Sequence, residues 1–159
     1  MEDLLILIIR WLHVLSGVMW IGLLWYFNFV QIPSMPKIPD DQKPAIGKVI
    51  APEALFWFRW SALSTVVFGL VLAMMNDYLV EALVLGNALI GLGMWLGLIM
   101  AFNVWFVIWP NQQKALGMVA VEADAKAKAA RTAMLFSRTN TMLSIPMLFA
   151  MVNAQNMTL

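Results

Sequence analysis

The sequence predicts an all-α integral membrane protein of four transmembrane helices, arranged as two repeated hairpins, with the N- and C-termini on the non-cytoplasmic side. Three observations predict this fold: the composition, four long apolar segments, and an apolar phrase that occurs twice. The chain of 159 residues is 62% hydrophobic and 12% charged, whereas soluble domains have about 45–50% apolar and about 25% charged residues. We therefore expect a single four-helix membrane domain, residues 1–159.

Four segments are long enough to cross a bilayer, which takes about 20 apolar helical residues. They cover residues 4–30, 54–75, 82–109 and 132–152. Because proline interrupts helical hydrogen bonding, the third should end at Pro110 and the fourth should be kinked at Pro146. The predicted connections are a proline-rich loop over 31–53, a tight turn over 76–81, and a polar stretch over 111–131 that includes an exposed helix.

The basic residues predict the orientation of these helices, because they gather on the cytoplasmic side of a membrane. The two long connections hold seven of them: Lys37, Lys43, Lys48, Lys114, Lys126, Lys128 and Arg131. The opposite side holds Arg10, slightly inside the first helix. Both termini should therefore face away from the cytoplasm.

The phrase "MWIGLLWYFN" (19–28) returns as "MWLGLIMAFN" (94–103), with six of ten positions identical. The copies lie on the first and third predicted helices, which cross the membrane in the same direction. A parallel repeat of this kind predicts two hairpins related by a pseudo-two-fold axis along the membrane normal. Coincidence between two apolar helices is the alternative.

Two asparagines and two arginines are predicted at similar depth near the cytoplasmic helix ends. Asn28, Asn103, Arg59 and Arg138 lie five to seven residues inside those ends, or about 8–11 Å along the helix axis. Charged groups inside a membrane usually face the bundle interior and meet a partner. The four residues are candidates for binding an anionic group; the alternative is that the arginines extend to the lipid headgroups.

The one histidine of the chain, His13, lies on a helical face with Gly17 and Trp20, one turn inward from Arg10. This combination suits the edge of a haem b: an imidazole ligand for the iron, a glycine that admits a flat ring, and an arginine for a propionate. With one histidine, the second axial ligand would be Met, water or His13 of another subunit. The alternative is a packing face in which His13 hydrogen-bonds a hydroxyl or backbone carbonyl across helices.

Other features narrow the functional classes. The chain has no cysteine, which excludes disulfides, thiolate metal sites, covalent haem c attachment and iron–sulfur ligation. A net charge of +1 gives no reason to expect nucleic acid as a partner. The spacing Gly93-x-x-x-Gly97 favours close helix packing, and the thirteen methionines are expected to be adaptable packing residues.

Three stretches together resemble a known family. They are "RWLHVLSGVMWIGLLWYFNF" (10–29), "NVWFVIWPNQQKAL" (103–116) and "SRTNTMLSIPMLFAM" (137–151). They are similar to the N-terminal membrane domain of the bacterial membrane-bound urate oxidases, urate hydroxylases that end in a cytochrome c domain. Members of that family are longer, and the absence of cysteine means that this chain corresponds at most to the membrane part without the cytochrome c domain.

The resemblance implies oxidation of urate in the bacterial inner (cytoplasmic) membrane, with electrons passed to a cytochrome c. Together with the haem b site predicted at His13, it favours a redox module that is a urate-oxidising oxidoreductase component and passes electrons to a separate acceptor, such as an external cytochrome c. Two other classes stay open. One is a non-catalytic membrane subunit that braces a larger respiratory or photosynthetic complex or forms a homo-oligomer. The other is a small anion transporter, which the repeat and the intramembrane polar residues suggest.

Overall fold

A computed structural model describes residues 1–154, which form helices and turns and no strand. The elements are α1 (Glu2–Trp25), the π-helical turn η1 (Tyr26–Gln31), α2 (Ile32–Ser34), the 3-10 turn η2 (Met35–Lys37), α3 (Lys43–Ala45), the π-helical turn η3 (Ile46–Ile50), α4 (Ala51–Met75), α5 (Leu79–Leu83), α6 (Ala88–Phe102), the π-helical turn η4 (Asn103–Ile108), α7 (Trp109–Ala115) and α8 (Ala123–Asn153). Neighbouring elements join into three continuous helices that are long and apolar enough to span a membrane: Glu2–Lys37, Lys43–Met75 and Ala88–Ala115.

Prolines lie inside these continuous helices, so the prediction that the third helix ends at Pro110 is wrong. Pro33, Pro52 and Pro110 each follow a π-helical turn by two residues. In each turn the residue before the proline donates its backbone N–H to the carbonyl five residues back, as Trp109 does to Val104. A proline ring normally clashes with the carbonyl four residues back, and the wider turn changes the position of that carbonyl.

Because helix continues past the prolines, the connection predicted over 31–53 is much shorter in the structure. Helix continues through Lys37 and resumes at Lys43, so residues 38–42 alone form the loop. The predicted start of the third helix, residue 82, is also wrong. The chain instead forms the short helix α5 and then turns at Leu85, which has a left-handed φ of 60°. The long helix begins at Ala88, six residues after the predicted start at residue 82.

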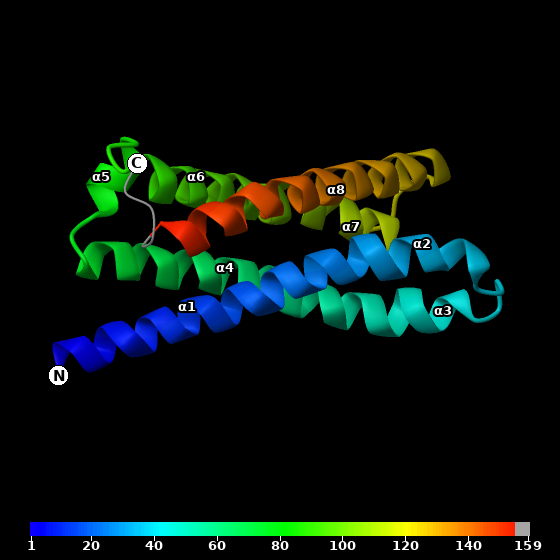
Figure 1. The fold of residues 1–159 in the computed structure, drawn as a ribbon. Helices are drawn as coiled ribbons and strands as arrows, with labels where there is room; N and C mark the ends of the chain where they lie inside the picture. The colour runs from blue at the N-terminus through cyan, green and yellow to red at the C-terminus, as the bar shows by residue number, and fades with distance from the viewer. Residues whose placement is uncertain (155–159) are drawn as a thin grey trace.

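The helices pack as two pairs, α1 with α4 and α6 with α8, which form two layers (Figure 1). The first residue of α1 and the last residue of α8 lie at the same end of the bundle. An apolar core of large side chains joins the layers in the half of the bundle away from these ends. Its most buried members are Trp20, Leu24, Phe58, Met100 and Ile108.

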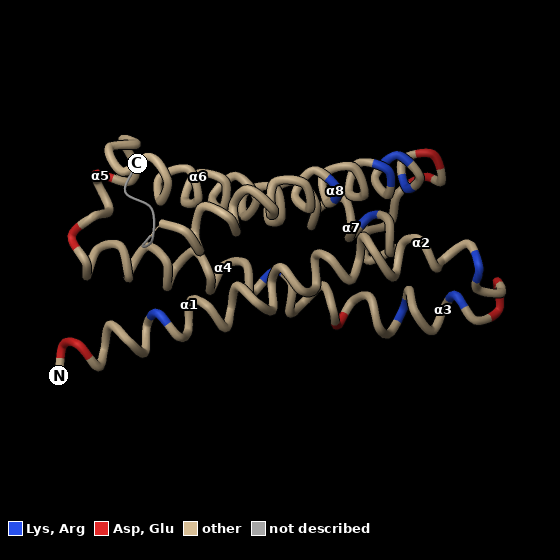
Figure 2. The backbone as a smooth tube through the Cα atoms, in the orientation of Figure 1, with Lys and Arg blue, Asp and Glu red and all other residues tan. Residues whose placement is uncertain are grey.

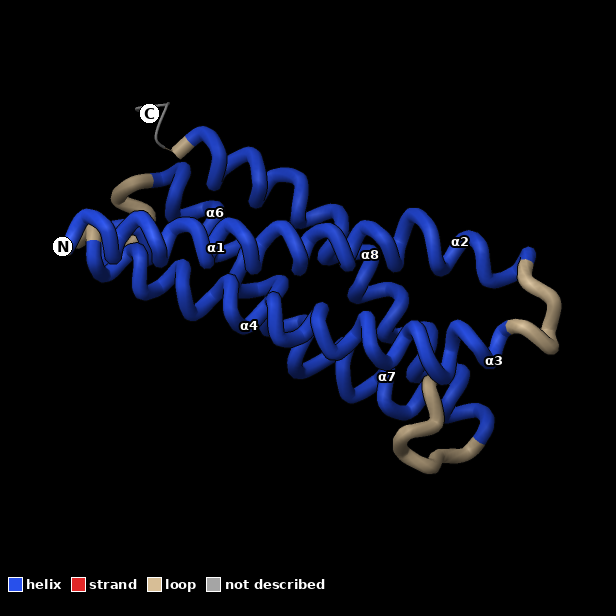
Figure 3. Tube along the Cα trace, turned by 90° about the horizontal axis from the view of Figure 1, so that it is seen from below, coloured by secondary structure: helices blue, strands red, loops and turns tan. Residues whose placement is uncertain are grey.

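Charged residues gather at the two ends of the bundle, and the basic residues gather mainly at the end opposite the termini (Figure 2). The longer connections lie at those same ends (Figure 3). The tube between the ends carries few charged residues. This distribution matches a bundle whose middle lies in hydrocarbon.

Helix α8 combines the predicted exposed helix and the predicted fourth membrane segment, and it continues through Pro146. Four of its polar side chains are buried: Ser137, Asn140, Thr141 and Ser144 are at most 8% exposed. Its large apolar side chains face outward instead, with Met142 74%, Ile145 63% and Phe149 57% exposed. A helix of a soluble protein shows the opposite arrangement.

Candidate functional site

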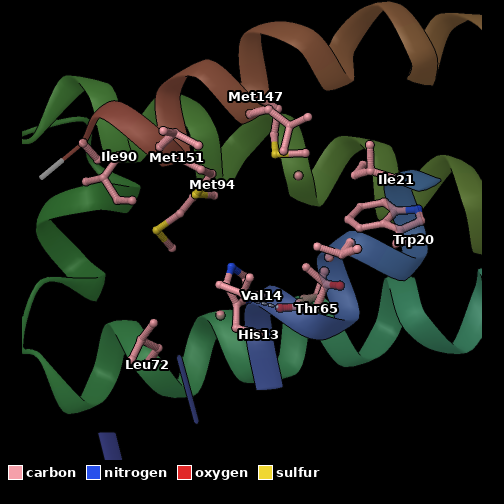
Figure 4. Close-up of a pocket in the computed structure, with 18 of the residues that line it drawn as sticks. His13, Val14, Trp20, Ile21, Thr65, Leu72, Ile90, Met94, Met147 and Met151 are labelled. Carbon is pink, nitrogen blue, oxygen red and sulfur yellow. Dashed lines mark hydrogen bonds between the residues drawn. The ribbon is translucent and has the colours of Figure 1, made fainter. Parts of the chain in front are cut away.

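A cavity of about 700 Å³ lies between the two helix pairs, in the half of the bundle nearest the termini (Figure 4). Its size falls in the range of small-molecule sites, which is about 300–1,000 Å³. The walls are mainly apolar, and their few polar groups come from Arg10, His13, Thr65 and Tyr78. An apolar cavity with a few convergent polar groups is the usual form of a cofactor or ligand site.

His13 is held at the wall of this cavity by α4. Its Nδ1 lies 2.8 Å from the backbone carbonyl oxygen of Thr65. A carbonyl oxygen can only accept a hydrogen bond, so Nδ1 carries the proton and donates. This tautomer leaves a lone pair on Nε2. Histidines that bind metals typically donate their other ring N–H to a carbonyl or carboxylate in this way.

Gly69 allows the imidazole to approach α4 so closely. A Cβ at Gly69 would lie 2.8 Å from Cε1 and 3.0 Å from Nδ1 of His13. A side chain at this position would therefore push the ring away from α4 and lengthen its hydrogen bond. The glycine and the Thr65 carbonyl together fix the histidine.

Two further glycines leave bare backbone on opposite walls. A Cβ added to Gly22 of α1 or to Gly97 of α6 would meet no heavy atom within 4 Å. Both residues line the cavity, and they are equivalent positions in the repeated phrase. The space beside them can admit the edge of a flat group.

One rim of the cavity carries hydrogen-bond donors. Tyr78, which follows the end of α4, and Arg10 of α1 both line it. Burial raises the pKa of Tyr78, and the nearby positive charge of Arg10 offsets part of this rise. The phenol is therefore protonated at neutral pH, and it forms a donor pair with the guanidinium that suits a carboxylate.

All four residues predicted to bind haem line this one cavity: His13, Arg10, Gly17 and Trp20. The side chain of Trp20 is 1% exposed, and its Nε1 is buried without a hydrogen-bond partner among residues 1–154. Haem binding itself stays a prediction. Thr65, Gly69 and Tyr78 were not foreseen, because neither a backbone carbonyl nor a glycine in an apolar helix gives a signal in one sequence.

The predicted asparagines lie in the other half of the bundle, and both reach α8. Asn28 Nδ2 donates to Ser137 Oγ at 2.8 Å. Asn103 Nδ2 donates to Asn140 Oδ1 at 2.9 Å, and Asn140 Nδ2 donates to the Met100 carbonyl at 2.9 Å. These bonds tie α8 to both helices that carry the repeated phrase.

Neither arginine has a hydrogen bond to the two asparagines among residues 1–154. The Arg59 guanidinium lies over the Trp109 ring, 3.4 Å from its centroid, and donates to the Leu55 carbonyl at 3.2 Å. Arg138 is exposed on the outer surface of α8. An anion site formed by these arginines with Asn28 and Asn103 therefore stays a prediction.

Substitution of Asn140 by leucine is expected to destabilise the bundle by about 2–3 kcal/mol. The change removes two hydrogen bonds. The buried Asn103 Nδ2 loses its acceptor on Asn140, and the Met100 carbonyl loses its side-chain donor. Thr139→Leu is the matched control, because Thr139 is exposed and bonds within its own helix. Denaturation in mixed detergent micelles measures both variants, and equal stabilities would contradict the role of the network.

The sequence of the second helix pair is similar to a known family. Residues 83–158 match the family model described as urate oxidase N-terminal. The match contains the two stretches at 103–116 and 137–151 that carried the resemblance, which is therefore confirmed.

The family match covers the end of α5 together with α6, η4, α7 and α8. It contributes one wall of the cavity, including Met94, Gly97 and Met151, whereas His13 lies before the matched residues. No curated protein and no solved structure matches the chain.

Proposed function

We propose that this chain is a membrane redox module of the urate oxidase N-terminal family, which binds haem b in the cavity and passes electrons to a separate acceptor. The observation that carries the proposal is His13, whose protonated Nδ1 is bound to the Thr65 carbonyl and whose ring faces an apolar cavity of about 700 Å³. Urate is the proposed electron donor, because the second helix pair matches that family. An external cytochrome c is the proposed acceptor.

The proposal places four helices across the bacterial inner membrane, with α8 as the fourth. Three helices meet the length and apolarity needed to span. The outward apolar and inward polar faces of α8 support a lipid-facing position for it. The basic residues at the end opposite the termini support a cytoplasmic location for that end (Figure 2). The α1–α4 and α6–α8 pairs would be the two repeated hairpins.

The residues around the cavity fit a haem b. The bare backbone at Gly22 and Gly97 gives room for a planar ring between two helices. Arg10 and Tyr78 would bind the propionates at the rim, and His13 would bind the iron through Nε2. When bound, the haem would supply one-electron transfer, which the side chains of the chain do not supply by themselves.

The chain's own groups would set the properties of that site. The Thr65 carbonyl orients the imidazole and raises its basicity by accepting the Nδ1 proton. The apolar walls exclude water from the ligand side of the ring. Arg10 supplies positive charge at the rim, where it would neutralise propionate charge.

The testing experiment is an absorption spectrum of the purified protein, before and after reduction with dithionite, from cells grown with ample haem. We expect a Soret band and sharp reduced α and β bands in the wild type. His13→Ala should lose at least about ten-fold in haem content, because the only imidazole is removed. Urate should then reduce the wild-type haem under anaerobic conditions.

Two controls make the result specific. Ser16→Ala changes a neighbouring position of α1 outside the cavity lining and should keep the spectrum. His13→Gly should regain the bands when free imidazole is added, which a purely structural role of the histidine would not produce. A wild-type spectrum with tryptophan absorbance only would overturn the redox proposal, and co-purification with a larger complex would then favour a bracing subunit.

A further inference from the structure

We propose that Met94 of α6 is the second axial ligand of the haem, opposite His13 of α1, so that the bound haem joins the two helix pairs. This inference rests on the proposed function. It answers the question raised by a chain with one histidine: where the sixth iron ligand comes from. It also assigns a role to one of thirteen methionines that are otherwise ordinary packing residues.

The cavity offers three thioethers on the side opposite His13. Met94, Met147 and Met151 all line it, and Figure 4 shows them extending from the α6 and α8 side of the cavity while His13 lies on the α1 and α4 side. Methionine sulfur is a natural partner for histidine in haem ligation. The choice among the three is decided by what each side chain packs against.

Met151 and Met147 serve the packing of the bundle. Met151 lies against α6, since its Cγ and Cε would be 3.2 and 3.3 Å from a Cβ at Gly93. Met147 is 6% exposed and belongs to the main apolar core, together with Trp20 and Ile21. A thioether that binds a haem in the cavity would have to leave those contacts in both cases.

Met94 lies outside the main core. It is 9% exposed and belongs to a second, smaller cluster with Ala73 and Ala82, whose packing partners include the cavity-lining residues Leu70, Tyr78, Ile90 and Met151. Gly97 follows it by one turn on the same helix, with open space where a Cβ would be. The sulfur of Met94 therefore borders the open part of the cavity, across from the imidazole (Figure 4).

The internal repeat supports a single site of this kind. The counterpart of Met94 in the first phrase is Met19, which is 43% exposed on the outer face. The counterpart of His13 is Ala88. Met19 does not line the cavity, and His13 has no histidine counterpart, so the repeat does not generate a second site.

Leucine substitutions test the assignment, because leucine and methionine have similar volume and polarity. We would purify three variants, Met94→Leu, Met147→Leu and Met151→Leu, and compare each with the wild type. The measurements are the haem content, the charge-transfer band between ferric haem iron and methionine sulfur, and the midpoint potential. We expect Met94→Leu alone to lose the charge-transfer band and to shift to a lower potential, since methionine ligation raises the potential. It should keep its Soret band, because His13 remains.

The outcomes separate this inference from the proposed function. A wild type with haem but no sulfur ligation, or a charge-transfer band that survives Met94→Leu, overturns the inference and leaves haem binding standing. Loss of the band in Met147→Leu or Met151→Leu instead overturns the assignment to Met94. A wild type without haem overturns both proposals. Met94→His adds a positive readout: it should give the spectrum of a bis-histidine haem.

Discussion

Replacing Gly91 by alanine should destabilise the protein by about 3 kcal/mol or more, at the upper end of the range for overpacking. A Cβ at this position would lie 2.4 Å from the backbone carbonyl oxygen of Ala82 and 2.9 Å from Leu85 Cδ2. The first of these is a backbone atom that cannot rotate away. Relief of the clash requires α5 to move off α6, and this would disturb the short connection between the two helix pairs.

Thermal or denaturant unfolding in detergent, followed by tryptophan fluorescence, measures this effect. Trp95 is a suitable reporter, because its Nε1 donates to the Leu83 carbonyl at 3.1 Å and thus links α6 to α5. Gly97→Ala on the same helix is the matched control. It meets no atom within 4 Å, so the higher helix propensity of alanine should leave stability unchanged or raised. Similar stabilities of the two variants would contradict the close α5–α6 contact.

Replacing Gly69 by alanine should weaken haem binding by about 10- to 100-fold, the usual loss when a group that orients a metal-binding histidine is disturbed. The new methyl group would occupy the space of the His13 ring, 2.8 Å from its Cε1. The ring would have to leave the Thr65 carbonyl and lose its fixed orientation. Haem titration of the purified protein, followed at the Soret band, gives the affinity.

The control for Gly69 is Gly47→Ala, in the π-helical turn η3, where a Cβ meets nothing within 4 Å. This variant should bind haem like the wild type. Unchanged haem affinity in Gly69→Ala, in a protein that does bind haem, would show that the His13–Thr65 bond does not position the ligand. Loss of affinity in both variants would indicate a general folding defect rather than a local one.

Composition and helical spacing were enough to predict the class of the protein and one face of the cavity. Its composition and long apolar segments predicted the helices, because a chain so poor in charge has no soluble alternative. The helical spacing of His13, Gly17 and Trp20 on α1 put these residues on one face, and the structure places that face along the cavity. The motifs at 103–116 and 137–151 indicated the family that the comparison confirms.

The pairs of residues that meet across helices could not be predicted from one sequence, because such contacts join positions far apart in the chain. His13 and Thr65 are 52 positions apart, and Asn28 and Ser137 are 109 apart. The sequence rule for proline is local, so it missed the π-helical turn that lets the third helix continue past Pro110. Gly69 and Met94 resemble any glycine and methionine of an apolar helix until the neighbouring helices bring them to the cavity.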